Sequence, residues 1–315
     1  MPPLTERILS RLPGPTALWI IAWTAAGPLA LIAWIGVPPP PEFPLWGMAV
    51  VFAYLNCITL WGVRKIHNDL QQLRPLLTRL LQNEGEPDPF KAVGSTAGPL
   101  VLTVILLLVQ ILVDVLGLPR VGSVQAAVLL LIAYLPAATG LWVYFTLFAG
   151  LERIGRTDVK LTPHYEDRSL GLRPLGSLAF SAFLLFAAAM GPVVIYATHT
   201  PTDAVITLAI IFGGMAVFFV SLVRLRQKQV AEKLALLAWA RTLYADAFVP
   251  VEQAGSLQAF MDQRQKLDAA EALERRIAAI QEWPFDDSIV RTVAGIFTGL
   301  LGAVIARIVL NELGL

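Results

Sequence analysis

The densest group of reactive side chains lies in the segment from Thr162 to Arg168, which reads Thr-Pro-His-Tyr-Glu-Asp-Arg. A histidine beside a carboxylate can start an acid-base pair or a metal site, so we consider a candidate site formed by His164, Glu166, Asp167 and Arg168. Only two other histidines exist in the chain, so a complete metal site needs ligands from elsewhere. Three interpretations stay open: a solvated loop that anchors the next helix, a catalytic or metal centre, and a ligand-binding or regulatory site.

The rest of the sequence carries no familiar catalytic motif. A phosphate-binding glycine-rich loop, a His-Glu-x-x-His zinc helix and a Gly-x-Ser-x-Gly elbow are all missing. The single cysteine, Cys57, excludes an intrachain disulfide and a multi-thiolate metal site. We therefore assign no catalytic residue, metal ligand or cofactor, and the sequence favours a protein that is not an enzyme.

Two ionisable residues, Asp114 and Arg307, stand within long apolar segments, each about four residues before the outer end of its segment. Burying a charge in lipid is costly, so each is expected to have a charged partner or an aqueous path. Gln110 and Thr103 share a helical face with Asp114. The four residues are candidates for a polar pathway or gate, and the equal depth of the two charges allows them to pair. The alternative for Arg307 is a side chain that reaches up to the outer interface.

Membrane-spanning helices must position these residues, because the chain is 56% apolar and only 15% charged. A spanning helix needs about 20 mostly apolar residues. The segments that meet this requirement are Pro15–Val37, Pro44–Val63, Ala97–Leu118, Ser123–Gly150, Leu175–Thr198, Asp203–Val223 and Ile289–Asn311. The sequence therefore predicts an all-α polytopic membrane protein with seven spans, arranged as three hairpins plus one final helix.

The distribution of Lys and Arg predicts the orientation of these spans. Cytoplasmic connections collect positive charge, and an inner N-terminus puts nearly all Lys and Arg in inner segments, with only Arg120 in an outer loop. The N-terminus is thus predicted in the cytoplasm and the C-terminus outside. The net charge of +1 gives no field that attracts nucleic acid, so we expect no nucleic-acid partner.

The predicted organisation is a six-span region at 1–224 with inner loops at 64–96 and 151–174, a cytoplasmic helical hairpin at 225–285, and a seventh span at 286–315. No Gly or Pro occurs between Gly214 and Pro250, so the sixth span is predicted to continue as a stalk. A second helix, at about 257–281, is expected to pack antiparallel on it, with the turn near Pro250 and Gly255. The residues expected in the seam are Val230, Leu234, Leu237, Tyr244, Phe260, Leu267, Leu273, Ile277 and Ile280. The hairpin is either a structural element or a surface for a partner or regulator.

Another inner segment, 64–83, carries apolar residues at helical spacing among several basic ones. A basic amphipathic helix beside a span lies naturally on the anionic inner leaflet. Packing against the cytoplasmic stalk is the equal alternative.

The last span contains a row of small residues, Gly295, Gly299 and Ala303, at intervals of four. Small residues at this spacing let helix backbones approach closely, so the row is a candidate helix-packing interface. Its partner is either another span of the same chain or a second subunit, and we expect a homo-oligomer.

The segment from His164 to Gly176 reads His-Tyr-Glu-Asp-Arg-Ser-Leu-Gly-Leu and then ends in Leu-Gly at the start of a span. It resembles a loop of uncharacterised bacterial multi-pass inner-membrane proteins, where the pattern is His-Pro-Asp, then Gly-Gly-Leu and a span. Tyr165 and Glu166 precede the aspartate here, and Leu170 stands at the first glycine position. The resemblance covers about fourteen residues. It implies a bacterial cytoplasmic-membrane protein and supplies no activity.

Functions of three classes are consistent with these features. The first is a homo-oligomeric channel or passive transport protein, whose polar and proline-interrupted spans line a pathway. The second is a membrane-anchored signalling or scaffold protein that binds a cytoplasmic protein through its hairpin. The third is a membrane enzyme that uses the histidine-carboxylate loop. The lipid bilayer is a partner in each case.

Overall fold

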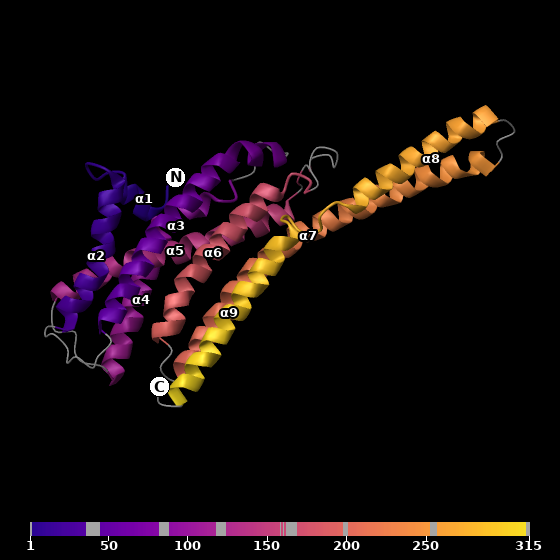
Figure 1. Ribbon diagram of the computed structural model, residues 1–315. Coiled ribbons are helices and arrows are strands. Elements are labelled where there is room, and N and C mark those ends of the chain that lie inside the picture. The colour runs from indigo at the N-terminus through magenta and orange to yellow at the C-terminus, as the bar shows by residue number, and fades with distance from the viewer. Residues whose placement is uncertain are drawn as a thin grey trace.

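The computed structural model describes residues 2–35, 45–81, 88–117, 124–157, 159, 161, 169–197, 201–252 and 257–312. Within these residues the chain is helical apart from connecting turns and one isolated bridge between Leu81 and Val159. The helices, shown in Figure 1, are α1 (Leu4–Leu9), α2 (Thr16–Ile35), α3 (Leu45–Leu80), the short 3-10 helix η1 (Lys91–Gly94), α4 (Ala97–Gly117), α5 (Val124–Arg156), α6 (Arg173–Ala197), α7 (Pro201–Glu252), α8 (Leu257–Ala278) and α9 (Asp287–Glu312). The predicted all-α class is confirmed.

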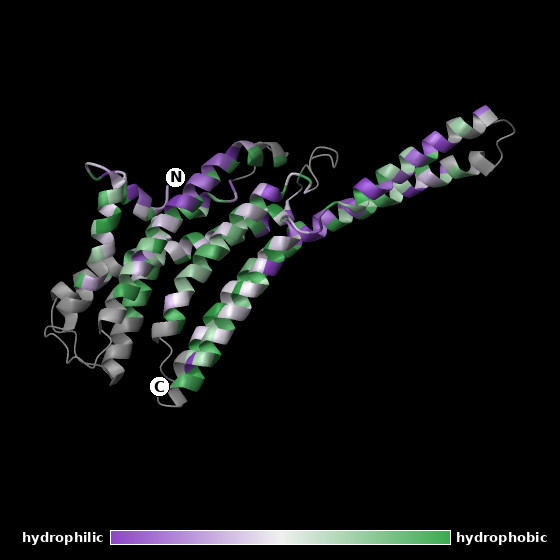
Figure 2. Ribbon diagram, in the orientation of Figure 1, coloured by the Kyte–Doolittle hydropathy of each residue, from purple (hydrophilic) through white to green (hydrophobic). Residues whose placement is uncertain are grey.

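Four helical stretches of the described part are long and apolar enough to cross a membrane: Tyr134–Arg156, Arg173–Val194, Ala204–Asp246 and Ser288–Leu310. They belong to α5, α6, α7 and α9 and overlap four of the expected spans, so by length and composition these helices are compatible with an integral membrane protein. Helices α2 and α4 and the first part of α3 occupy the positions of the other three, and the total of seven stays a prediction. Figure 2 shows apolar residues along the body, with hydrophilic ones at one end of it and along the projecting hairpin.

The helices of the body pack as two rows. Helices α2, α3, α6 and α9 contact one another in that order, and α4, α5 and α7 form the second row in the same way. Contacts of α5 with α2 and α3, and of α7 with α6 and α9, join the rows. The main apolar core lies between them and includes the fully buried Phe148 and Phe218. As a result α2 and α4 lie at one edge of the body and α9 at the other (Figure 1).

Helix α3 continues well beyond the apolar segment that ends at Val63. Its extension buries an apolar stripe in the main core, against α5 and α6: Ile66, Leu70, Leu73, Leu77 and Leu80. Both expectations for this segment are therefore corrected. The apolar face is covered by protein rather than lipid, and it packs on the body rather than on the stalk.

Helix α7 passes without interruption from the body into a long projection, and α8 packs on its distal part to form a two-helix hairpin (Figure 1). The seam between the two helices is narrow, with Ala240, Ile277 and Ile280 buried in it. Leu234 was expected in this seam but is 60% exposed. Helix α7 continues through Pro250 to Glu252 and α8 begins at Leu257, so the connection between them falls in the region around Pro250 and Gly255 where the turn was expected.

Charged contacts fix the base of the hairpin. Glu282, which follows α8, lies 3.6 Å from a side-chain nitrogen of both Arg226 and Lys233 of α7. The Arg226 guanidinium also lies 4.9 Å from the centroid of the Trp283 ring, within the range of a cation–π contact. The chain returning from α8 is thus held directly against α7.

Apolar contacts then tie the same connection to the body. Phe285 stacks on Trp283 and on Phe218 of the main core, at centroid distances of 5.6 Å and 6.1 Å. Gly176 of α6 lies so near the backbone of Pro284 that an added Cβ would fall 1.9 Å from the proline carbonyl oxygen. Helices α6 and α7 and the α8–α9 connection therefore form one close-packed junction.

Candidate functional site

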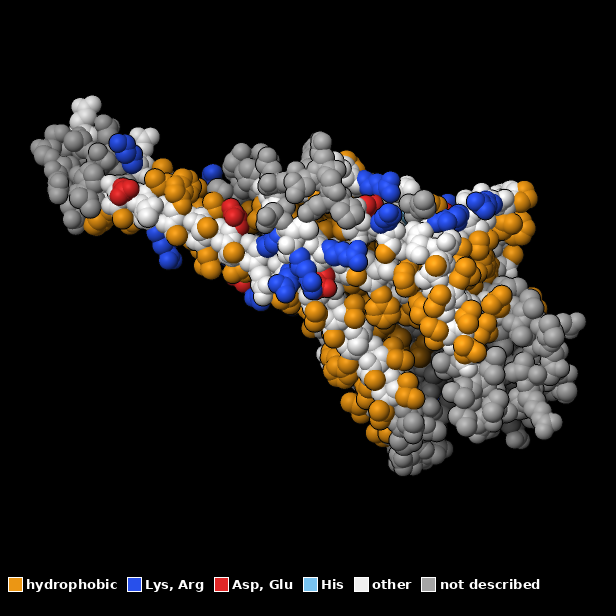
Figure 3. Space-filling view, turned by 180° about the vertical axis from the view of Figure 1, so that it is seen from behind, with side chains coloured by type: hydrophobic (Ala, Val, Ile, Leu, Met, Phe, Trp, Pro, Cys, Tyr) orange, Lys and Arg blue, Asp and Glu red, His pale blue; other side chains and the backbone are white. Residues whose placement is uncertain are grey.

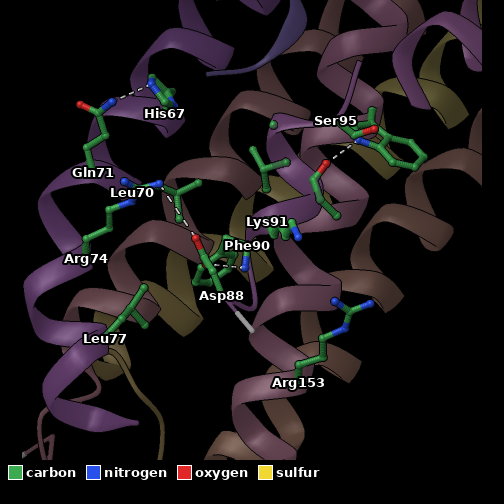
Figure 4. Close-up of a pocket in the computed structure, with 14 residues that line it drawn as sticks. His67, Leu70, Gln71, Arg74, Leu77, Asp88, Phe90, Lys91, Ser95 and Arg153 are labelled. Atoms are coloured by element: carbon green, nitrogen blue, oxygen red, sulfur yellow. Dashed lines mark hydrogen bonds and ion pairs between the residues drawn. The ribbon is translucent and has the colours of Figure 1, made fainter. Parts of the chain in front are cut away.

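A cavity of about 530 Å³ opens between the extension of α3, the segment before α4 and the end of α5 (Figure 4). Three separate parts of the chain bring charged side chains to it. Arg74 comes from α3, Asp88 and Lys91 from the segment that contains η1, and Arg153 from the last turn of α5.

The cavity carries more positive than negative charge. The Asp88 Oδ1 accepts a hydrogen bond from the Phe90 backbone N–H at 2.9 Å, and its Oδ2 lies 4.0 Å from Arg74 Nη2. That second distance is at the limit of an ion pair, so the pair is loose. The side chains of Lys91 and Arg153 are exposed, and neither side chain has a hydrogen-bond or ion-pair partner within the described part of the chain. Three cationic side chains thus line the cavity with one carboxylate.

A neutral histidine stands at one side of the cavity. The Gln71 amide nitrogen lies 2.8 Å from His67 Nε2, one turn away on α3. Partial burial lowers the pKa of His67 below its usual 6.5, and nearby positive charge, including that of Arg74, lowers it further. At neutral pH the ring therefore contributes hydrogen bonding and no charge.

Two glycines hold the η1 segment tightly against the body. A Cβ added at Gly98 would lie 2.2 Å from the Trp142 ring, and one added at Gly150 would lie 2.5 Å from the Phe90 ring. The Trp142 Nε1 also donates a hydrogen bond to the Ala92 carbonyl at 2.9 Å. The wall that carries Lys91 is therefore fixed in position, although its lysine extends freely.

The lining suits the binding of an anion better than catalysis. No group of three or more His, Cys, Asp or Glu suited to a metal occurs in the described residues. Among the described lining residues, Ser95 has the one hydroxyl, and that oxygen lies 3.5 Å from the Gly98 N–H in a turn before α4 rather than beside a base. The cavity is lined by cationic side chains together with apolar ones that include Leu70 and Phe90.

The histidine-carboxylate loop singled out from the sequence lies outside the described residues, which leave out 162–168. The turn that follows it is described. Leu170 and Gly171 both adopt positive φ, at 55° and 84°. A left-handed leucine costs about 1 kcal/mol that a glycine avoids. Here Leu170 is buried against Ala240 and Ile277 of the hairpin, which offsets that cost.

The polar residues expected to form a pathway are described only in part. Thr103 is buried, but its hydroxyl donates to the Pro99 carbonyl of its own helix at 2.7 Å. The side chains of Gln110 and Asp114 lie outside the described part. Arg307 is on α9, which packs on α6 and α7, whereas α4 packs on α5. A direct pair between Asp114 and Arg307 is therefore not supported by the helix packing.

Arg307 has a feature of its own. Its side chain is partly buried, and its Nε is buried without a hydrogen-bond partner among the described residues. Arg291, near the start of α9, also falls within the expected seventh span, but it is exposed. The two arginines of this helix thus differ in burial: Arg291 is exposed and Arg307 is partly buried.

The small-residue row of α9 faces away from the neighbouring described helices. Gly295, Gly299 and Ala303 are exposed, and a Cβ added at either glycine would meet no atom within 4 Å. The row therefore does not serve as a packing interface between the described helices of one chain. Packing against a second copy stays a prediction.

Sequence reasoning missed the cationic cavity. Arg74, Lys91 and Arg153 are far apart in the chain and follow no motif, so only the tertiary fold reveals them as neighbours. The available signal was the excess of basic residues in two adjacent inner loops. No family model, no curated protein and no solved structure matches this chain.

Proposed function

We propose that the protein is a membrane-anchored scaffold, in which copies of the chain associate through the projecting α7–α8 hairpin. The observation that carries this proposal is the uncovered apolar surface of the hairpin. A two-helix projection encloses no reaction space, so its function depends on what its surface contacts. Large exposed apolar surfaces on otherwise well-packed proteins mark interaction sites.

Both sides of the hairpin seam carry exposed apolar side chains. Trp239 and Leu243, one turn apart on α7, form one flank and are 50% and 38% exposed. Leu234 and Phe248 are exposed on the other flank. A helix that needs to pack on one neighbour requires one apolar stripe, whereas a wider apolar surface is typical of helices in a larger bundle. A second hairpin laid against this one would cover the flank.

The choice of a second copy as partner rests on geometry. Copies held in one bilayer present their hairpins at the same height, which gives a high effective concentration. Helix α9, which carries the open glycines, lies at the edge of the body from which the hairpin projects (Figure 1). A two-fold axis along the membrane normal lets two copies use both surfaces at once.

The charge distribution supports a cytoplasmic location for the hairpin. In Figure 3, Lys and Arg side chains gather along the boundary between the apolar lower body and the part from which the hairpin projects. Cytoplasmic faces of membrane proteins collect such residues. We therefore propose an inner N-terminus and an outer C-terminus, and the resemblance of the 164–176 segment supports a bacterial cytoplasmic membrane.

Passive transport by an oligomer is the second candidate function, and one observation favours it. The unpaired, buried Nε of Arg307 requires a polar partner or water that the described part of one chain does not supply. An oligomer that lines a polar path with Arg307 would supply it. Ion or solute flux into liposomes that contain the purified protein, lost in Arg307→Gln, would favour this function over a scaffold.

Co-purification of two differently tagged copies tests the scaffold proposal. The expected result is that one tag recovers the other from detergent-solubilised membranes, and that the double substitution Trp239→Glu and Leu243→Glu prevents it. Thr242→Glu is the matched control, because this exposed residue lies on the outward face of α7 between the two flanks. Failure of the wild-type copies to co-purify, or equal loss in the control, would overturn the proposal.

A further inference from the structure

We propose that the cavity between α3, η1 and α5 binds the phosphate group of an anionic ligand at the membrane surface. The ligand must carry a negatively charged phosphate group. An anionic phospholipid headgroup and a soluble phosphate compound both meet it, and the experiment below separates them. This site is independent of the hairpin and of the scaffold function.

The first support is the imbalance of charge in the cavity. Asp88 is the one carboxylate among the described lining residues, so a single negative charge stands against the three cationic side chains of the cavity. The Lys91 ammonium and the Arg153 guanidinium make no hydrogen bond or ion pair within the described part of the chain. In Figure 4 the two side chains extend toward the same region from different elements. An anion placed there would meet both.

The second support is the match between the donors and a phosphate. An arginine presents a planar fork of N–H donors, and a lysine adds a point charge. A phosphate monoester offers three terminal oxygens and a phosphodiester two, and each oxygen can accept more than one hydrogen bond, so either group can accept from several of the cavity's cationic donors. The cavity volume of about 530 Å³ leaves room for a headgroup larger than the phosphate itself.

The third support is the apolar surroundings of the cavity. Trp142 and Phe90 line it beside the cations, and the helix that follows, α4, begins at the cavity edge. Leu100, Val101 and Val104 are exposed at the start of α4. A phospholipid can therefore place its phosphate among the cations while its acyl chains run along α4. Charged donors above an apolar wall are the arrangement that such a molecule requires.

Competition binding to the purified full-length protein in a neutral detergent tests the proposal. The probe is a fluorescent short-chain phosphatidylglycerol, and the competitors are unlabelled phosphatidylglycerol, diacylglycerol and inorganic phosphate. Diacylglycerol keeps the chains and lacks the phosphate, so it is expected not to compete. Competition by diacylglycerol equal to that by phosphatidylglycerol would overturn the proposal.

Substitutions locate the binding. Arg153→Gln and Lys91→Gln are each expected to weaken phosphatidylglycerol binding about fivefold, which corresponds to about 1 kcal/mol for one basic residue near an anionic headgroup. Arg156→Gln is the matched control, because Arg156 ends the same helix but pairs with Glu152 at 2.5 Å outside the cavity. All three side chains are exposed, so the fold is expected to survive each change. Equal weakening by the control, or no weakening by the two cavity variants, would overturn the site.

The competitor series also identifies the source of the phosphate. If millimolar inorganic phosphate displaces the lipid probe and this displacement needs Arg153 and Lys91, the site takes a soluble phosphate as well, and the proposed chemistry stands. If only phosphatidylglycerol competes, the headgroup of a lipid is the ligand. If both variants bind the probe as tightly as the wild-type protein, neither a lipid headgroup nor a soluble phosphate binds at this site.

Discussion

The close approach of Gly176 to Pro284 makes a sharp prediction for the base of the hairpin. In Gly176→Ala the new Cβ would lie 1.9 Å from the Pro284 carbonyl oxygen and 2.6 Å from its carbon. Real Cβ contacts essentially never fall below 3.0 Å. The carbonyl must therefore retreat by about 1 Å, and because it is backbone it cannot do so by changing a rotamer.

The cost follows from what surrounds Pro284. Its neighbours Trp283 and Phe285 stack at 5.6 Å, and Trp283 also holds Arg226. Overpacking of this kind costs about 1–3 kcal/mol, and a retreat that disturbs several contacts belongs at the upper end. Replacing a helical glycine returns about 1 kcal/mol. We expect a net loss of about 2 kcal/mol, or a fall of about 4 °C in the midpoint of thermal unfolding.

Thermal unfolding in detergent, followed by near-UV circular dichroism, measures this loss. Gly213→Ala is the matched control, because Gly213 is also helical but a Cβ there would meet nothing within 4 Å. The control is expected to unfold at or slightly above the wild-type temperature. If Gly176→Ala unfolds no earlier than Gly213→Ala, the close-packed junction is refuted.

Three further predictions concern separate parts of the molecule. His67 has a lowered pKa, so the folded protein resists its protonation while the unfolded chain takes up a proton near pH 6.5. The contribution of the neutral ring to stability is therefore present above that pH and is lost below it. His67→Gln should reduce the fall in unfolding temperature between pH 7 and pH 5.5. Equal falls would contradict it. Gly299→Leu should leave the unfolding temperature of the monomer unchanged, because a side chain there meets no neighbouring atom. The same substitution should lower the fraction of dimer measured by light scattering. An unchanged dimer fraction would show that this face of α9 takes no part in dimer formation. Cys57 is exposed on the body, in the expected second span. In intact membranes it should therefore react with a lipid-permeant maleimide and resist an impermeant one. Rapid labelling by both reagents would refute that span.

The elements of the fold were predictable where the signal is local. Uninterrupted apolar stretches identify the long helices of the body, and the absence of Gly or Pro after Gly214 indicates that α7 leaves the body as one helix. The hairpin was less predictable in detail. Leu234 has the spacing of a seam residue but is exposed, because a two-helix seam is narrower than the apolar stripe of α7.

The candidate site was not predictable, because its parts are joined by tertiary contacts alone. The stripe from Ile66 to Leu80 has the pattern of a surface-lying membrane helix, and only the fold shows that α5 and α6 cover it. That packing is what brings Arg74 to Arg153. For Thr103, which was expected on a polar path, the structure adds that its hydroxyl donates to a carbonyl of its own helix, and the path stays a prediction.

Contact between the hairpins of two copies can be tested by measuring the distance between labels placed on the two hairpins. A single spin label at position 242 requires the variant Thr242→Cys in a Cys57→Ser background, since Cys57 is the only cysteine. In a bundle with helices packed about 8–10 Å apart, labels on the outward faces of two copies are expected at ~20–40 Å. Pulsed electron paramagnetic resonance on protein diluted in liposomes should therefore show a defined distance in that range, which disappears when Trp239→Glu is added. A dipolar signal no stronger than that of randomly distributed labels would contradict the account.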